Sequence, residues 1–277
     1  MLDNVLTDVT LPYGSVPLLS RHAFLCKGKK VKIYNLCTRL ICTLLCTILP
    51  YAFTDEQDDG TASPWSGTIS FAGEYRYGNQ RIKSSTLSAD ALFSKKNNEF
   101  LSNIRSYFAS DDTGIIARNS ALSAKYDRLL TERLSWYVSE ELLNNRFKDL
   151  DLRSTSGTGA AYRIWKSDRK KLTVEIGAAY ITEDRIVYEN TEETSGRAAA
   201  QMTIKNGGGI VFKESIEILP SFEKGGEYLL KNDFSILTGL GAGWALKLNH
   251  LLQHDTDPPE NIRKTDVTLS LGIQYSF

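Results

Sequence analysis

The last thirteen residues of the chain, TDVTLSLGIQYSF (265–277), alternate apolar with polar or small side chains at a period of two. The apolar set is Val267, Leu269, Leu271, Ile273, Tyr275 and Phe277; the set between them is Asp266, Thr268, Ser270, Gly272, Gln274 and Ser276. Successive side chains of a β-strand point to opposite faces of its sheet. The stretch is therefore expected to form a strand with one unbroken apolar face and one polar face.

The same alternation recurs along the chain from Trp65 onward. It is clearest in 65–77, 172–180, 198–205 and 242–249, where apolar or aromatic residues occupy every second position. No run with helical periodicity lies between these segments, and residues typical of turns separate them. The pattern predicts an all-β chain of about twelve antiparallel strands, within a range of roughly ten to fourteen.

The connections between the expected strands differ in length at the two ends. Short polar turns are expected after even-numbered strands, at KKNN (95–98), DRLLTE (127–132), KSDRK (166–170), NGGG (206–209) and GLG (239–241). Longer segments are expected after odd-numbered strands, at 110–114, 144–150, 183–195, 219–226 and 253–264, except for a first tight turn at Gly78-Asn79. Short turns at one end and long loops at the other are typical of outer-membrane β-barrels.

A soluble β-sandwich would also alternate, with its apolar face turned inward. Hairpins of similar length favour the barrel, and so do aromatic residues near the strand ends, namely Trp65, Tyr75, Tyr77, Phe93, Phe108, Tyr126, Trp165, Trp244, Tyr275 and Phe277. The polar face carries charges of both signs, namely Glu74, Arg76, Arg105, Lys125, Asp127, Arg153, Arg163, Glu175, Arg197, Lys213, Glu217 and Lys247. Because a sheet in hydrocarbon must pair all its backbone groups internally, we predict an up-and-down transmembrane β-barrel over 65–277 whose last strand pairs with its first.

The segment before the strands has the parts of a targeting sequence. Lys27, Lys29, Lys30, Lys32 and Arg39 precede an apolar run over 40–49, and a small residue, Ala52, follows it. These are the parts of a secretory signal peptide, and the run is too short for a spanning helix. We expect 31–52 to be the signal peptide, 53–64 a polar lead into the barrel, and 1–30 an upstream extension. Translation starting at Val31 or a genuinely long N-terminal extension would each account for 1–30.

Composition and motifs exclude several kinds of site. The formal net charge of the 277-residue chain is +0, which argues against nucleic acid as a partner. All four cysteines lie within the first 46 residues, so the strands hold neither a disulfide framework nor a cysteine zinc site. GTG (157–159) and NGGG (206–209) open no helix and are interpreted as thin-walled lumen positions and a turn. The acidic loops at 110–114, 190–194 and 255–260 fit no EF-hand spacing, so no metal site and no cofactor is predicted.

Catalysis would depend on the histidines. Only His250 and His254 follow the targeting segment, and both are expected near the last long loop. Neither is followed two residues later by the serine of a lipase-like pair. An aspartate-assisted protease would use His254 with Asp255 or Asp257, but the sequence places no second acidic pair beside them. We therefore predict no catalytic residue and no enzyme.

Six stretches, in this order, resemble a known family. They are GEYRYGNQR (73–81), AKYDRLLTERL (124–134), STSGTGAAYRI (154–164), LTVEIGAAY (172–180), HDTDPPENIRKTD (254–266) and the terminal LSLGIQYSF. Through their order and spacing, the chain resembles the salt-induced outer-membrane protein family, domain of unknown function 481, over about 66–277. The resemblance implies an outer-membrane β-barrel in a Gram-negative bacterium, and it implies little about chemistry.

Given that location, Val267, Leu269, Leu271 and Ile273 are expected to face lipid on the closing strand. Tyr275 and Phe277 match the terminal aromatic signal that the barrel-assembly machinery recognises in outer-membrane barrels generally. The other expected partners are outer-membrane lipid and lipopolysaccharide. The leading hypothesis is a narrow passive channel or an envelope-maintenance protein, with weak ion selectivity because the interior charge is mixed. The alternatives are an outer-membrane hydrolase and a structural or adhesive barrel that acts through its long loops.

Overall fold

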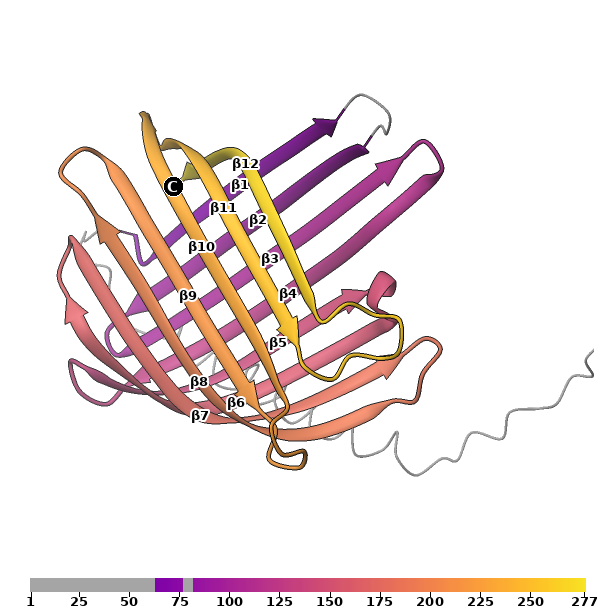
Figure 1. Ribbon diagram of the computed structural model, residues 1–277. Coiled ribbons are helices and arrows are strands. Elements are labelled where there is room, and N and C mark those ends of the chain that lie inside the picture. The colour runs from indigo at the N-terminus through magenta and orange to yellow at the C-terminus, as the bar shows by residue number, and fades with distance from the viewer. Residues whose placement is uncertain (1–62, 77–81) are drawn as a thin grey trace, which may run out of the picture.

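The computed structural model describes residues 63–76 and 82–277 and shows one closed antiparallel barrel (Figure 1). Its strands are β1 (Trp65–Arg76), β2 (Ile82–Lys95), β3 (Asn98–Asp111), β4 (Gly114–Leu129), β5 (Leu134–Asn145), β6 (Leu150–Lys166), β7 (Lys170–Arg185), β8 (Thr191–Lys205), β9 (Ile210–Pro220), β10 (Tyr228–Gly241), β11 (Trp244–Asp255) and β12 (Thr265–Ser276), with a 3-10 turn η1 (Arg146–Lys148) before β6. The predicted fold and strand number are confirmed. The predicted extension 1–30, the signal peptide 31–52, most of the polar lead and the Gly78-Asn79 turn lie outside the described residues.

Each strand pairs with its neighbours in the chain, and β12 returns to pair with β1. The seam pairs Thr68 with Ser276 at one end and Ala72 with Gly272 at the other. Beyond the first pair, the N–H and C=O groups of Gly67 and Phe277 bond each other reciprocally at 3.0 Å. A Cβ on Gly272 would lie 2.1 Å from the carbonyl oxygen of Phe71, so only glycine allows the two closing strands to approach this closely.

The barrel is apolar outside and polar inside. Ile69, Phe71, Ile104, Ile176 and Leu269 each expose between 48% and 71% of their surface on the outward face. The inward positions between such residues hold small or polar side chains, and Ser70, Ser88, Ser135 and Asn249 are among the buried ones. A soluble protein rarely exposes so continuous an apolar band, and a barrel in lipid requires one. In the part of the chain that the structure describes, no helix has the length and apolar character needed to cross a membrane.

Three predicted connections differ from the structure. The segment 110–114 is a tight turn, because Asp111 ends β3 and its Oδ1 accepts the N–H groups of Thr113 at 2.8 Å and Gly114 at 3.1 Å. The predicted loop 183–195 lies mostly within β7 and β8, where glutamates and threonines on both faces hide the alternation. GLG (239–241) belongs to β10, and the turn follows at 242–243, where both residues have positive φ. The long connections are 221–227 and 256–264.

Candidate functional site

Ion pairs cross the lumen between strands that are not neighbours in the sheet. Arg105 of β3 meets Asp233 of β10, with 2.6 Å between Nη2 and Oδ2. Lys231 of β10 meets Glu141 of β5, also at 2.6 Å between Nζ and Oε2. These side chains lie on the inward face because the period-two alternation of each strand places them opposite the apolar row. The pairs tie opposite walls of the barrel together and narrow its interior.

The two pairs remain in contact with water. The side chains of Arg105 and Asp233 are 20% and 21% exposed, and those of Lys231 and Glu141 are 31% and 29% exposed. Charges sealed in a dry core would expose almost nothing and would carry a large desolvation cost. The interior at this height is therefore accessible to water, although it is constricted.

A denser cluster fills one side of the lumen around Tyr137 of β5. The Tyr137 side chain is fully buried, with the Lys125 ammonium 4.8 Å and the Arg197 guanidinium 4.9 Å from its ring centroid. Arg197 donates from Nη1 to the Tyr137 hydroxyl and to Glu175, each at 2.7 Å. It also donates from Nε to Glu217 at 2.7 Å, and Lys125 donates to Glu175. Glu175 thus links two cations inside the barrel, and the cluster joins β4, β5, β7, β8 and β9.

Two glycines make room for the Tyr137 ring. Gly159 of β6 and Gly177 of β7 pair with each other on the inward face. A Cβ on Gly159 would lie 2.8 Å from the Tyr137 hydroxyl, and one on Gly177 would lie 2.7 Å from it. The GTG stretch therefore does thin the wall, as its sequence suggested, and the space it leaves is occupied by an aromatic side chain from the neighbouring strand.

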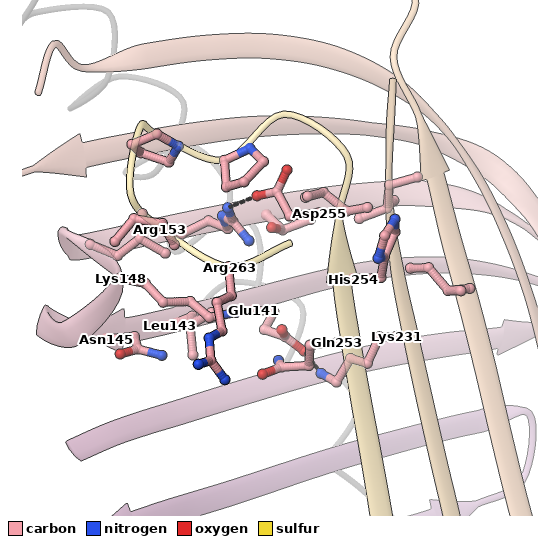
Figure 2. A pocket seen from close by; sticks show the side chains of 18 of the residues that line it. Glu141, Leu143, Asn145, Lys148, Arg153, Lys231, Gln253, His254, Asp255 and Arg263 are labelled. Atoms are coloured by element: carbon pink, nitrogen blue, oxygen red, sulfur yellow. Dashed lines mark hydrogen bonds and ion pairs between the residues drawn. The ribbon is translucent and has the colours of Figure 1, made fainter. Parts of the chain in front are cut away.

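A cavity of about 70 Å³ opens at the long-loop end of the barrel. Figure 2 shows most of the side chains that line it, and the charged ones include Glu141, Lys148, Arg153, Lys231, Asp255 and Arg263. Arg153 of β6 reaches across to Asp255 of β11, at 3.3 Å between Nη2 and Oδ2, and also pairs with Glu183. The loop 256–264 folds over the cavity through Pro258, Pro259 and Ile262. We call this space the vestibule.

A second, smaller cavity of about 20 Å³ lies deeper in the lumen, beside the seam. Its lining includes small polar side chains, Ser70, Ser88 and Ser270, together with Arg105 and Lys247. Along β10, Lys231 borders the vestibule, and Asp233 comes next on the inward face. The Arg105–Asp233 pair therefore lies between the level of the vestibule and that of the deeper cavity, which Arg105 also lines.

The long loops are bonded to one another at the mouth. Lys224 of the 221–227 loop and Asp257 of the 256–264 loop lie 2.7 Å apart, Nζ to Oδ2. This hydrogen bond raises the pKa of Lys224 and lowers the pKa of Asp257. Tyr188 donates its hydroxyl to the carbonyl oxygen of Glu260 at 3.0 Å. These bonds hold the loops in one arrangement above the vestibule.

The predicted closing strand has its apolar row on the outside. Val267, Leu269, Leu271 and Ile273 are between 44% and 64% exposed. Tyr275 stacks on Phe277 with 6.4 Å between ring centroids and lies 5.0 Å from Trp244. Their role as an assembly signal stays a prediction.

The two histidines lie on the strand that leads into the last long loop, and His254 is close to that loop, as expected. Both His250 and His254 are within β11, on its outward face, and not in the loop. His254 Nδ1 is 2.7 Å from the Thr265 hydroxyl, while Asp255 and Asp257 pair with Arg153 and Lys224. No acid–base pair of the kind considered for a protease is therefore assembled around His254. Within 63–76 and 82–277, no group of three or more His, Cys, Asp or Glu residues is arranged to hold a metal ion.

A closed antiparallel barrel with an exposed apolar exterior and an ion-paired, water-accessible interior defines the class of outer-membrane β-barrels. The chain belongs to the family described as "Protein of unknown function, DUF481", which matches residues 69–277. No curated protein matches the chain.

Several solved structures match most of the chain. The NanC porin is 6% identical, with a TM-score of 0.49 over 76% of this chain and 98% of that one. The KdgM porin is 10% identical, with a TM-score of 0.41 over 77% and 99%. The translocator domain of the autotransporter NalP from Neisseria meningitidis is 14% identical, with a TM-score of 0.39 over 79% and 90%.

Proposed function

We propose that this protein is a narrow passive channel for small hydrophilic solutes in the outer membrane of a Gram-negative bacterium. The observation that carries the proposal is the water-exposed Arg105–Asp233 pair between the vestibule and the deeper cavity. A barrel closed by its own core would bury this pair. Ser70, Ser88 and Ser270 line the deeper cavity at the seam, and small polar side chains of this kind suit a water-filled path.

The same geometry suggests which membrane components would contact the barrel. The exposed apolar band suits outer-membrane lipid, and the loop end suits lipopolysaccharide. Delivery would use the signal peptide expected at 31–52 and the barrel-assembly machinery. Because the crossing pairs hold equal numbers of each charge, we expect weak ion selectivity.

Recording single channels of the refolded, full-length mature chain in planar bilayers tests the proposal. We expect small, discrete conductance steps that scale with salt concentration. Heat-modifiable gel migration should establish beforehand that the barrel is folded. Folded protein without any conductance would overturn the channel proposal.

A structural or adhesive barrel is the second candidate, because the Lys224–Asp257 and Tyr188–Glu260 bonds give the mouth a defined surface. Shortening the 256–264 loop separates the two candidates. A channel should keep or increase its conductance, whereas a loop-dependent adhesin should lose its envelope phenotype and leave the conductance unchanged.

A further inference from the structure

We propose that the outward face of β9, β10 and β11 is a self-association surface through which two copies of this chain pair in the membrane. In this pairing, Glu214 of each copy contacts His250 of the other. The inference shares the membrane location with the proposed function, but it does not depend on channel activity.

Glu214 and His250 interrupt the apolar exterior near the middle of their strands. Glu214 of β9 is directly opposite Phe234 of β10, and Phe234 is directly opposite His250 of β11. Residues directly opposite each other in an antiparallel sheet share a face. That face is the outward one, since Ile216 and Leu248, two positions from Glu214 and His250, are 43% and 39% exposed. The row Glu214–Phe234–His250 is called here the acid–base row.

A polar side chain on a lipid face is costly and calls for a partner. Glu214 accepts a hydrogen bond from the side-chain amide of Asn232, which lies on the same outward face. Its second carboxylate oxygen and both ring nitrogens of His250 have no hydrogen-bond partner among the residues that the structure describes. A carboxylate can accept about four hydrogen bonds, so most of this capacity is unused.

Another outward carboxylate shows what a satisfied one looks like in this barrel. Glu140 of β5 faces outward with Ser154 and Ser156 of β6 beside it. Ser154 donates to one of its oxygens, and Ser156 donates to the other at 2.6 Å. The wall itself therefore satisfies Glu140. The acid–base row has only the Asn232 amide as a local donor, and it serves one oxygen of Glu214, so the unused capacity points to a partner from outside the wall.

The row is complementary to a second copy of itself. In a dimer with a two-fold axis along the membrane normal, each surface patch meets the same patch reversed. With the axis near Phe234, β9 of one copy faces β11 of the other, so the acid of each copy meets the base of the other. Strands about 4.8 Å apart and tilted by about 40° offset the two ends of the row by about 6 Å in height, within the combined reach of the two side chains.

Cross-linking through a single introduced cysteine tests the position of the surface. The four native cysteines all lie before the strands, so Phe234→Cys gives the barrel one reactive thiol. Mature protein reconstituted in lipid vesicles should form a disulfide-linked dimer on oxidation. The matched control is Ile104→Cys on β3, which is 55% exposed on a distant part of the exterior and should stay monomeric. Absence of the dimer at Phe234→Cys, or equal dimer at both positions, would overturn the proposal.

A charge swap tests the contact itself in the Phe234→Cys background. Glu214→His alone and His250→Glu alone should each reduce the cross-linked dimer about ten-fold, because a symmetric dimer loses two membrane hydrogen bonds at once. The double variant Glu214→His with His250→Glu restores complementarity and should recover the dimer. Unchanged cross-linking in both single variants would overturn the contact. Folded protein that conducts but stays monomeric would exclude the dimer and leave the channel proposal intact. Protein that dimerises but does not conduct would exclude the channel and leave the dimer proposal intact.

Discussion

Arg105 and Asp233, 128 residues apart in the chain, meet across the barrel with 2.6 Å between Nη2 and Oδ2. Their strands, β3 and β10, share no backbone pairing, so this contact exists only because the barrel closes. The pair lies between two polar cavities and carries one charge of each sign. If the lumen conducts, this pair is its constriction.

Removing one partner should therefore change both conductance and selectivity. Arg105→Ala leaves the Asp233 carboxylate alone at the constriction, so we expect larger conductance and a several-fold shift towards cations. Asp233→Asn should shift selectivity towards anions, because Arg105 then lacks its counter-charge. Reversal potentials across a salt gradient measure both shifts. Arg146→Ala, which breaks an exposed pair with Asp151 at the rim, is the control and should change neither.

Gly177→Ala should severely destabilise the barrel. The added methyl group would lie 2.1 Å from the Thr158 carbonyl oxygen and 2.7 Å from the Tyr137 hydroxyl, so both the strand spacing and the ring would have to move. Overpacking on this scale costs about 3 kcal/mol or more, or prevents folding. Denaturant titration in lipid, followed by heat-modifiable migration, measures the loss. Gly207→Ala, where no atom lies within 4 Å, should leave the midpoint unchanged.

Glu175→Gln tests the buried cluster. The substitution leaves Lys125 and Arg197 without the carboxylate that lies between them, in a site where the Glu175 side chain is 0% exposed. Arg197 keeps its pair with Glu217, and Lys125 keeps Asp127 at 3.2 Å, so the loss should lie at or below the roughly 3–5 kcal/mol of a fully broken buried ion pair. The free energy of unfolding should fall accordingly. Asp151→Asn, in a pair whose partners are both more than half exposed, should cost about 1 kcal/mol or less.

Much of this architecture was predictable from the period-two pattern. Each strand carries its own alternation, so local sequence is enough to predict the strands, their faces and the closing position of 265–277. The charged inward residues, among them Arg105 and Lys125, were also assigned correctly, because they alternate with apolar neighbours. Closure follows from the need to pair every backbone group in lipid.

The contacts that form the candidate site were not predictable in this way. The pairing of inward charges across the lumen depends on the diameter and stagger of the barrel. The partner of Arg105 therefore could not be predicted from the sequence. Glu140 and Glu214 break the alternation, and a pattern based on polarity has no means of placing them outward. The strand ends around 183–195 were missed for a related reason, because polar residues there occupy both faces.

The loop pair at the mouth gives a pH prediction. The hydrogen bond from Lys224 lowers the pKa of Asp257 below its ordinary 3.8, so the bond's contribution is complete above pH 3.8 and is lost as pH falls through the lowered value. On the alkaline side, the pKa of Lys224 is raised above 10.5, so the contribution is complete below pH 10.5 and is lost as pH rises through the raised value. Carboxyl NMR titration in micelles should show the Asp257 pKa returning towards 3.8 in Lys224→Met. An unchanged value would mean that the two loops do not pair in solution.

Although the Phe277 side chain is largely exposed, we expect it to contribute to barrel closure. Its backbone bonds Gly67 in both directions at 3.0 Å, and its ring covers Gly67 so closely that a Cβ there would lie 2.5 Å from Cζ. Phe277→Ala keeps the backbone bonds and removes the ring, so we expect slower assembly into the membrane and a smaller folded fraction. Pulse-chase of the heat-modifiable form in cells measures both. Phe222→Ala is the matched control, because Phe222 lies in the 221–227 loop and is 66% exposed against 65% for Phe277. Equal assembly of the two variants would show that the terminal ring is not a signal in this chain.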